Sequence, residues 1–189
     1  ANTSGGAWLT LQKASNTMTA GQTTCVADGT YVGFFVETTG TAGNPITFKA
    51  LGTGANINMP NWRSGTERTD GINIESYGTP SSYITIDGFK VYNQPRMGIR
   101  AIDGTGIIIQ NCTAYDNTDT GIFSANTPGI QVLNNNTYEN GTTQYQHNIY
   151  ISNAASDSPV IRGNTIRDSN AGNGLHVNGD WLEGGDGYI

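Results

Sequence analysis

The residues best suited to chemistry are an arginine, a tyrosine and a histidine that recur at one place in a repeated segment. Each copy starts with Gly or Asn and an aliphatic residue, and the next residue is Arg100, Tyr150 or His176 in three copies. A tyrosine and a histidine on either side of a sugar ring can donate and accept a proton, and an arginine can hold a carboxylate. This chemistry suits β-elimination or C5-epimerisation of a uronate, and we predict catalytic roles for these three residues.

Further residues are expected to contact the same ligand because strand alternation places them on the same outer face or beside it. They occupy the equivalent position in other copies, a position two residues later, or a segment next to a copy. The predicted substrate-binding residues are Asn73, Glu75, Phe123, His147, Asn178 and Trp181.

The last part of the chain is rich in carboxylates and glycines. Asp180, Glu183 and Asp186 lie within the glycine-rich stretch 179–187. Ca²⁺ takes six to eight oxygen ligands, which such a loop can provide, although the spacing is not that of an EF-hand. We therefore expect either a Ca²⁺ site or a solvated acidic loop.

The elements that must position these residues are short strands in a repeating coil. The repeated segments start at residues 71, 98, 121, 148 and 174, in steps of 27, 23, 27 and 26 residues. A second set of segments interleaves with them and has only Gly or Asn at one position, represented by Gly88, Asn111, Asn134 and Gly163. Gly and Asn are the residues that most readily adopt positive φ. A tight turn with a positive φ angle is therefore predicted at this position in every coil. At the next position, Asn135 and Asn164 are predicted to point inward and to stack their side-chain amides as a ladder.

A repeat of this length cannot bury its own inward face, so the copies are predicted to stack as strands about 4.8 Å apart around one core. A leucine-rich repeat would need more leucines, and a propeller would need blades of about 40 residues. The apolar spacing in residues 8–14 predicts a short helix over the open end of the first coil, where unpaired strand edges need cover. Residues 23–31 and 45–50 are predicted to be strands.

Composition restricts the partners and the location. The formal net charge of −6 disfavours nucleic acid and anionic membranes, which bind basic surfaces. No run of about 20 apolar residues is present, so no membrane span is predicted. The small polar start of the chain is compatible with a mature secreted protein. The two cysteines, Cys25 and Cys112, are expected to be buried free thiols.

Three N-terminal pieces, residues 11–14, 26–31 and 43–50, resemble the N-terminal cap of secreted parallel β-helix proteins. The later repeats resemble those of the pectate-lyase-like superfamily. The resemblance implies an all-β, right-handed, single-stranded parallel β-helix with a short N-terminal capping helix. It also implies a secreted protein acting on polysaccharides, in a superfamily that hosts lyases, hydrolases, epimerases, tailspikes and adhesins.

One domain is expected over residues 1–189, with a cap over about 1–31 and coils over about 32–189. The C-terminal end is expected to be uncapped or truncated, which would leave it open to a second copy of the chain. The predicted function is action on an extended acidic polysaccharide as a lyase or epimerase. A glycoside hydrolase, a non-catalytic glycan-binding adhesin and a structural β-helix segment remain alternatives.

Overall fold

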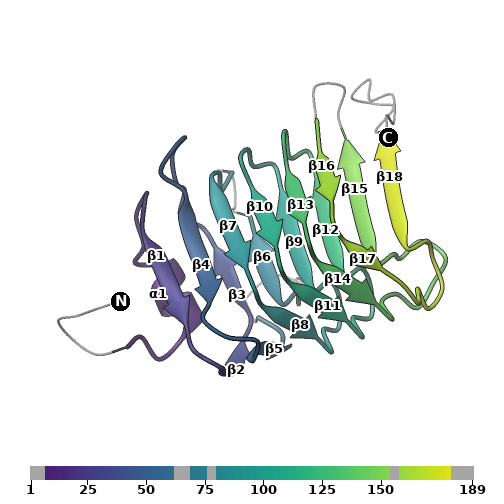
Figure 1. The fold of residues 1–189 in the computed structure, drawn as a ribbon, viewed down its shortest axis with the longest axis horizontal. Coiled ribbons are helices and arrows are strands. Elements are labelled where there is room, and N and C mark those ends of the chain that lie inside the picture. Colours follow the sequence, from purple (N-terminus) through teal and green to yellow (C-terminus); the bar gives the residue numbers. More distant parts are fainter. Residues whose placement is uncertain (1–6, 62–68, 76–79, 154–157, 180–189) are drawn as a thin grey trace.

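The protein is a stack of parallel strands coiled around one narrow core. The computed structural model describes residues 7–61, 69–75, 80–153 and 158–179. Within this part of the chain the strands run in three sheets of six, and the chain visits each sheet in turn. Figure 1 shows the coils following one another from the N-terminal to the C-terminal end. The predicted all-β parallel solenoid is confirmed.

Each sheet takes every third strand of the chain. The first sheet contains β1 (Thr23–Val26), β4 (Ile46–Ala50), β7 (Ile84–Asp87), β10 (Ile108–Gln110), β13 (Gln131–Leu133) and β16 (Val160–Arg162). The second sheet contains β2 (Gly29–Val32), β5 (Ala55–Met59), β8 (Lys90–Tyr92), β11 (Thr113–Tyr115), β14 (Asn136–Tyr138) and β17 (Thr165–Ile166). The third sheet contains β3 (Phe34–Val36), β6 (Ile72–Ile74), β9 (Ile99–Ile102), β12 (Ile122–Ala125), β15 (Ile149–Asn153) and β18 (Leu175–Gly179).

The core is made of aliphatic residues that stack in register from coil to coil. In the third sheet Ile72, Ile99, Ile122 and Ile149 pair in sequence and are all fully buried. Three phenylalanines fill the interior of the early coils, and the rings of Phe34 and Phe48 lie 4.9 Å apart. Burial of these large apolar side chains is the main source of stability in such a stack.

The turn between the first and second sheets has the backbone that the repeat predicted. The φ angles are 85° at Gly88, 54° at Asn111, 55° at Asn134 and 71° at Gly163. The predicted amide ladder is also confirmed, since Asn135 Nδ2 donates to Asn164 Oδ1 over 3.0 Å. A fixed turn and a stacked amide at this corner hold the coils in register.

A second amide ladder runs between the second and third sheets. Asn117 Nδ2 donates to Asn140 Oδ1 over 2.8 Å, and Asn140 Nδ2 donates to Asn148 Oδ1 over 2.8 Å. All three side chains are buried, so the ladder satisfies polar groups that would otherwise be costly. It fixes the corner from which β15 starts, two residues before Tyr150.

The predicted N-terminal helix is present as α1 (Leu11–Ser15). Thr10 caps it by accepting the Lys13 backbone N–H at 3.1 Å. The Gln12 side chain accepts the N–H of Phe35 and donates to its carbonyl, so one amide occupies the edge of β3. The helix therefore protects the outer edge of the third sheet, as expected.

One expectation about the N-terminal region is confirmed and another is wrong. The strand predicted over residues 23–31 is present as β1 and β2. Cys25 is exposed, because alternation along β1 turns Val26 inward and Cys25 outward. Cys112 is buried as predicted, and burial raises the pKa of its thiol to about 12, so it stays protonated. In the described part of the chain, no helix has the length and hydrophobicity to cross a membrane.

Candidate functional site

The third sheet lines up five outward positions of the repeat in a single column. The strand register pairs Asn73 with Arg100, Arg100 with Phe123, Phe123 with Tyr150, and Tyr150 with His176. Adjacent members therefore lie one strand spacing apart, as the repeat predicted. The column divides into two parts with different surroundings.

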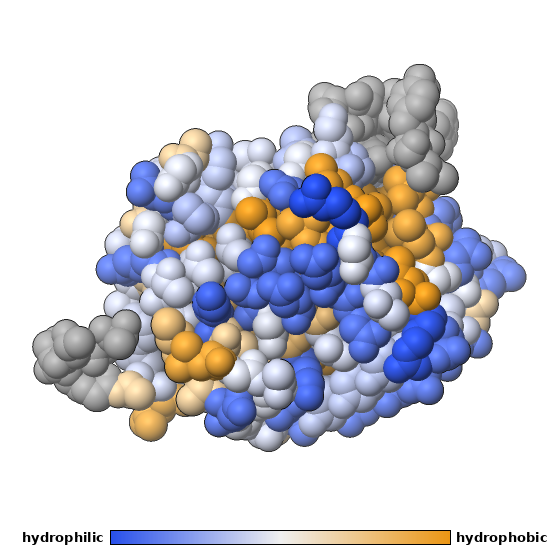
Figure 2. Space-filling view, viewed as in Figure 1, coloured by the Kyte–Doolittle hydropathy of each residue, from blue (hydrophilic) through white to orange (hydrophobic). Residues whose placement is uncertain are grey.

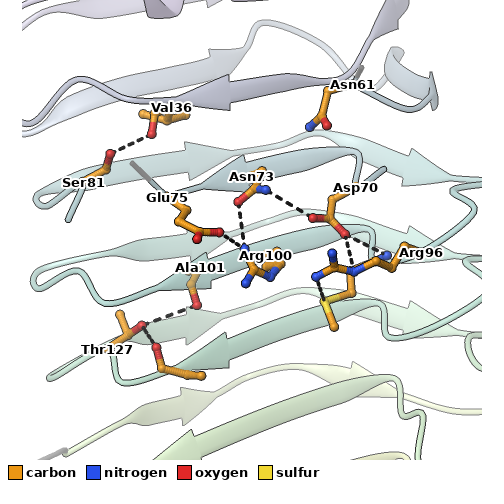
Figure 3. A network of polar contacts seen from close by, with 12 residues as sticks. Val36, Asn61, Asp70, Asn73, Glu75, Ser81, Arg96, Arg100, Ala101 and Thr127 are labelled. Carbon is orange, nitrogen blue, oxygen red and sulfur yellow. Dashed lines mark hydrogen bonds and ion pairs between the residues drawn. The ribbon is translucent and has the colours of Figure 1, made fainter. Parts of the chain in front are cut away.

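The early part of the column is a buried ionic network (Figure 3). Arg100 forms an ion pair with Glu75 and donates from Nη1 to Asn73 Oδ1 at 3.3 Å. Asn73 Nδ2 donates to Asp70 Oδ2 at 3.2 Å, and Asp70 forms an ion pair with Arg96. Charges removed from water in this way require partners of opposite sign, and here each has one.

This network changes the roles that geometry allows. Arg100 was expected to face a groove and neutralise a substrate carboxylate, but it is only 6% exposed and already paired with Glu75. Asn73 was predicted to bind substrate, but its side chain is fully buried and does not reach the surface where a ligand would bind. The alternation of strand residues identified the outward direction but not the burial of these two side chains.

The late part of the column is an aromatic and imidazole cluster. The Tyr150 and His176 rings stack with centroids 5.0 Å apart, and Phe123 meets Tyr150 edge-on at 5.4 Å. Asn178 Nδ2 donates to the Tyr150 hydroxyl at 3.2 Å. Stacked rings at this spacing leave no room for a sugar between them, contrary to the expected arrangement. A substrate would instead meet the edges of the two rings, where the hydroxyl and a ring nitrogen lie.

His147 lies beneath this pair and is buried. Its Nδ1 accepts the backbone N–H of Asn173 at 2.9 Å, and its Nε2 lies 2.8 Å from His176 Nδ1. Burial lowers the pKa of His147, and the neighbouring His176 lowers it further. His147 was predicted as a substrate-binding residue; it is among the residues that line the pocket described next, but both of its ring nitrogens are engaged by the protein.

The cluster opens into a pocket of about 480 Å³. The described residues that line it are Gln144, Tyr145, His147, Tyr150, Asn173 and His176. Tyr145 is 76% exposed, so an aromatic face is available at the pocket wall. Sequence reasoning missed Gln144, Tyr145 and Asn173 because they lie in loops between strands, outside the repeated positions. The one sequence feature that could have pointed to this loop is Tyr145, which stands between two glutamines just before His147.

The predicted calcium ligands Asp180, Glu183 and Asp186, and the predicted sugar-binding Trp181, lie outside the described residues. Over the described ranges, which end at residue 179, no three His, Cys, Asp or Glu side chains gather as a metal site.

The molecular surface is largely polar on the face seen in Figure 2. Hydrophobic residues gather toward the C-terminal coils, where Val160 and Leu175 are partly exposed, and in a smaller area near the first coil. The pocket lies among the late coils, since its described lining residues belong to β15, β18 and the connections before them.

Comparisons with known proteins support the fold. Residues 51–181 match the family described as "Right handed beta helix region". A search of curated proteins found no match. Three solved structures share the fold at low identity, and this chain spans about half of their length or less.

The alginate lyase from Paenibacillus sp. str. FPU-7 is 21% identical, with a TM-score of 0.62 over 82% of this chain and 54% of that one. Pectate lyase Pel9A is 17% identical, with a TM-score of 0.54 over 75% of this chain and 40% of that one. Geobacillus virus E2 ORF18 is 16% identical, with a TM-score of 0.61 over 87% of this chain and 38% of that one. With the family match covering more than half of its length and three parallel sheets coiled around one core, this chain belongs to the right-handed β-helix family.

Proposed function

We propose that this protein binds an extended acidic polysaccharide along the third sheet and removes a proton from a uronate residue, as a lyase or a C5-epimerase. The observation that carries the proposal is the pairing of Tyr150 and His176 at the wall of one pocket. A phenol and an imidazole are both able to exchange a proton with a bound sugar. Tyr145 adds an exposed aromatic surface against which a sugar ring can pack.

Both reactions start from the same step. A base takes the C5 proton beside the carboxylate. In elimination, the electron pair left at C5 forms the C4–C5 double bond, and the departing sugar oxygen at C4 takes a proton from an acid. In epimerisation, a proton returns to C5 from the opposite face. Tyr150 and His176 are the proposed acid and base.

Support for the substrate class comes from the structural neighbours. The two enzymes among them are named for alginate and pectate, which are both polyuronates. An extracellular location is part of the proposal, because such polysaccharides lie outside cells. A Ca²⁺ requirement through Asp180, Glu183 and Asp186 is a further part of it, since a bound cation would offset the charge of an acidic ligand.

Ultraviolet absorbance of new unsaturated ends tests the lyase form. The protein is incubated with alginate, pectate and glycosaminoglycans, with Ca²⁺ and with a chelator. Product whose formation stops on chelation would support a Ca²⁺ site. The C5 configuration of recovered alginate or pectate, read by NMR, tests the epimerase form.

The variant Tyr150→Phe tests the residue assignment. Removing the hydroxyl should lower turnover by at least about 100-fold, the usual contribution of a general acid or base. Tyr115→Phe is the matched control, because Tyr115 also faces outward but lies in a tyrosine stack on the second sheet, 4.8 Å from Tyr92. Full activity of Tyr150→Phe, or equal loss in both variants, would remove Tyr150 from the mechanism.

A non-catalytic glycan-binding protein is the second candidate. The observation that favours it is the ion pair of Arg100 with Glu75, which occupies the cation expected to assist proton removal. Saturable binding of a polyuronate without any product would support this reading. A glycoside hydrolase has less support, because it uses two carboxylates and the described residues lining the pocket carry none.

A further inference from the structure

The hydrogen bonds beneath the pocket have a fixed direction. They start at the Asn173 backbone N–H, which can only donate, and it lies 2.9 Å from His147 Nδ1. The chain continues from His147 Nε2 to His176 Nδ1 over 2.8 Å. The backbone donor therefore determines where the hydrogens of both imidazole rings lie.

A neutral imidazole carries one N–H and one bare nitrogen. Because His147 Nδ1 accepts from the backbone, its hydrogen must be on Nε2. That hydrogen is donated to His176 Nδ1, which must then be bare, and the hydrogen of His176 must be on Nε2. Within the described residues, no hydrogen-bond partner engages His176 Nε2, and His176 lines the pocket.

We infer that His147 is a positioning residue that holds the proton of His176 on Nε2, so that the pocket presents a hydrogen-bond donor to the carboxylate of a uronate. The inference rests on the proposed function for the identity of the ligand, but not for the direction of the hydrogen bonds. A neutral His176 with its hydrogen on Nε2 and its Nδ1 engaged by His147 donates a hydrogen bond but exchanges no proton, so Tyr150 is the member of the proposed acid–base pair that exchanges a proton with the sugar.

Extra protons do not fit into this arrangement. A proton added to His147 would go to Nδ1 and face the Asn173 N–H. A proton added to His176 would go to Nδ1 and face the His147 N–H. Asp119 is the carboxylate that acts on His147, and its effect is smaller than those of burial and His176. The neutral pair is therefore the arrangement that the surroundings favour.

The Tyr150 hydroxyl strengthens the same polarity. It accepts the Asn178 amide hydrogen at 3.2 Å, so its own hydrogen remains available to a ligand. Two donors at the edges of stacked rings suit an anionic oxygen better than the neutral oxygen of an ester. Hydrogen bonds to charged groups are also the stronger class.

NMR of the wild-type protein tests the hydrogen positions without any variant. The chain has only two histidines, so long-range ¹H–¹⁵N spectra give two ring patterns. At about pH 8, above the ordinary histidine pKa of about 6.5, both rings should carry hydrogen on Nε2. A nitrogen–nitrogen coupling should join His147 Nε2 to His176 Nδ1. Hydrogen on Nδ1 of either ring, or no such coupling, would overturn the inference.

Binding tests the consequence for the ligand. Trigalacturonate and trimannuronate are compared with their methyl esters, which keep the sugar and lose the charge. The free acids should bind at least about tenfold more tightly, the usual loss when one hydrogen bond to a charged group is removed. Equal affinity of acid and ester, or no binding of either acid, would overturn the carboxylate assignment.

Two variants of His147 separate positioning from packing. The amide of His147→Gln can still donate to His176 Nδ1 and should keep the preference for the acids, whereas His147→Leu should lose it. Loss in both variants, or in neither, would contradict a positioning role. The expected NMR pattern and acid preference without any turnover would retain the inference and reject the proposed catalysis. Turnover with hydrogen on His176 Nδ1 would do the reverse.

Discussion

At the scale of single residues, the pocket depends on which side chains of the column reach it with their polar atoms. Tyr150 and His176 keep an edge at the pocket, while Arg100 turns its charge to Glu75. His147 is hidden below them and accepts its first hydrogen bond from the backbone of Asn173. The chemistry of the site is therefore concentrated in the late coils of the third sheet.

The lowered pKa of His147 has a consequence for stability. Below about pH 6.5 an unfolded His147 takes up a proton that the folded protein resists binding, so stability falls as the pH falls. The stabilising contribution of His147 is complete above the ordinary histidine pKa. It is lost as the pH falls from that pKa to the lowered pKa of the folded protein. Urea unfolding at a series of pH values measures it, and the slope cannot exceed about 1.4 kcal/mol per pH unit for one group.

The variant His147→Gln is the control for this pH dependence, because an amide does not titrate. Its free energy of unfolding should change less between about pH 7 and pH 5 than that of the wild type. An identical slope in the two proteins would show that His147 does not cause the dependence.

At the scale of elements, the corners of the coil contribute to holding the coils in register as much as the strands do. The turn residues Gly88, Asn111, Asn134 and Gly163 could be predicted, because only residues that tolerate positive φ occur there. The ladder through Asn117, Asn140 and Asn148 was not predicted, because its last two members are only eight residues apart and follow no regular step.

The predicted ladder gives a direct test of the corner. Asn135→Ala removes the acceptor of the buried Cys112 N–H and the donor to Ile109 and Asn164. Buried groups left without partners should lower the free energy of unfolding by about 2–4 kcal/mol. Gln131→Ala, on the half-exposed face of β13, should change it by about 0.5 kcal/mol or less. Equal effects in chemical denaturation would show that the ladder adds nothing to stability.

Two glycines separate backbone strain from crowding. Both Gly141 and Gly129 have positive φ, but a Cβ at Gly141 would lie 2.9 Å from the backbone carbonyl oxygen of Gln146, whereas one at Gly129 would meet nothing within 4 Å. Gly129→Ala should lower the free energy of unfolding by about 1–2 kcal/mol from φ alone. Gly141→Ala should cost more, and a thermal melt showing equal losses would contradict the crowding.

At the scale of the whole molecule, an acidic protein is proposed to hold an acidic polymer. The formal net charge is −6, so long-range forces oppose the approach of a polyuronate. Raising the salt concentration from about 0.01 to 0.15 M shortens the screening length from about 30 to 8 Å and should lower KM or Kd. Titrations with alginate or pectate at the two salt concentrations measure this, and weaker binding at high salt would contradict it.

The repeat predicted the coil, the register of the column and the side of the sheet that faces outward. It could not predict the burial of Arg100, because strand alternation gives the direction of a side chain and not how much of it is exposed. It also missed Tyr145, which comes from a connection between β14 and β15. Periodic stacking is visible in one sequence, whereas the irregular connections that shape a pocket are not.

Exchange of the C5 hydrogen with solvent is the most direct test of the central claim, because lyase and epimerase chemistry both begin there. The protein is incubated with alginate or pectate in D₂O, and the recovered sugars are examined by mass spectrometry and NMR for deuterium at C5 or for unsaturated ends. We expect either signal with the wild type and Tyr115→Phe and neither with Tyr150→Phe. Neither signal from the wild type, in a sample shown to bind the polymer, would contradict proton abstraction and leave a glycan-binding protein.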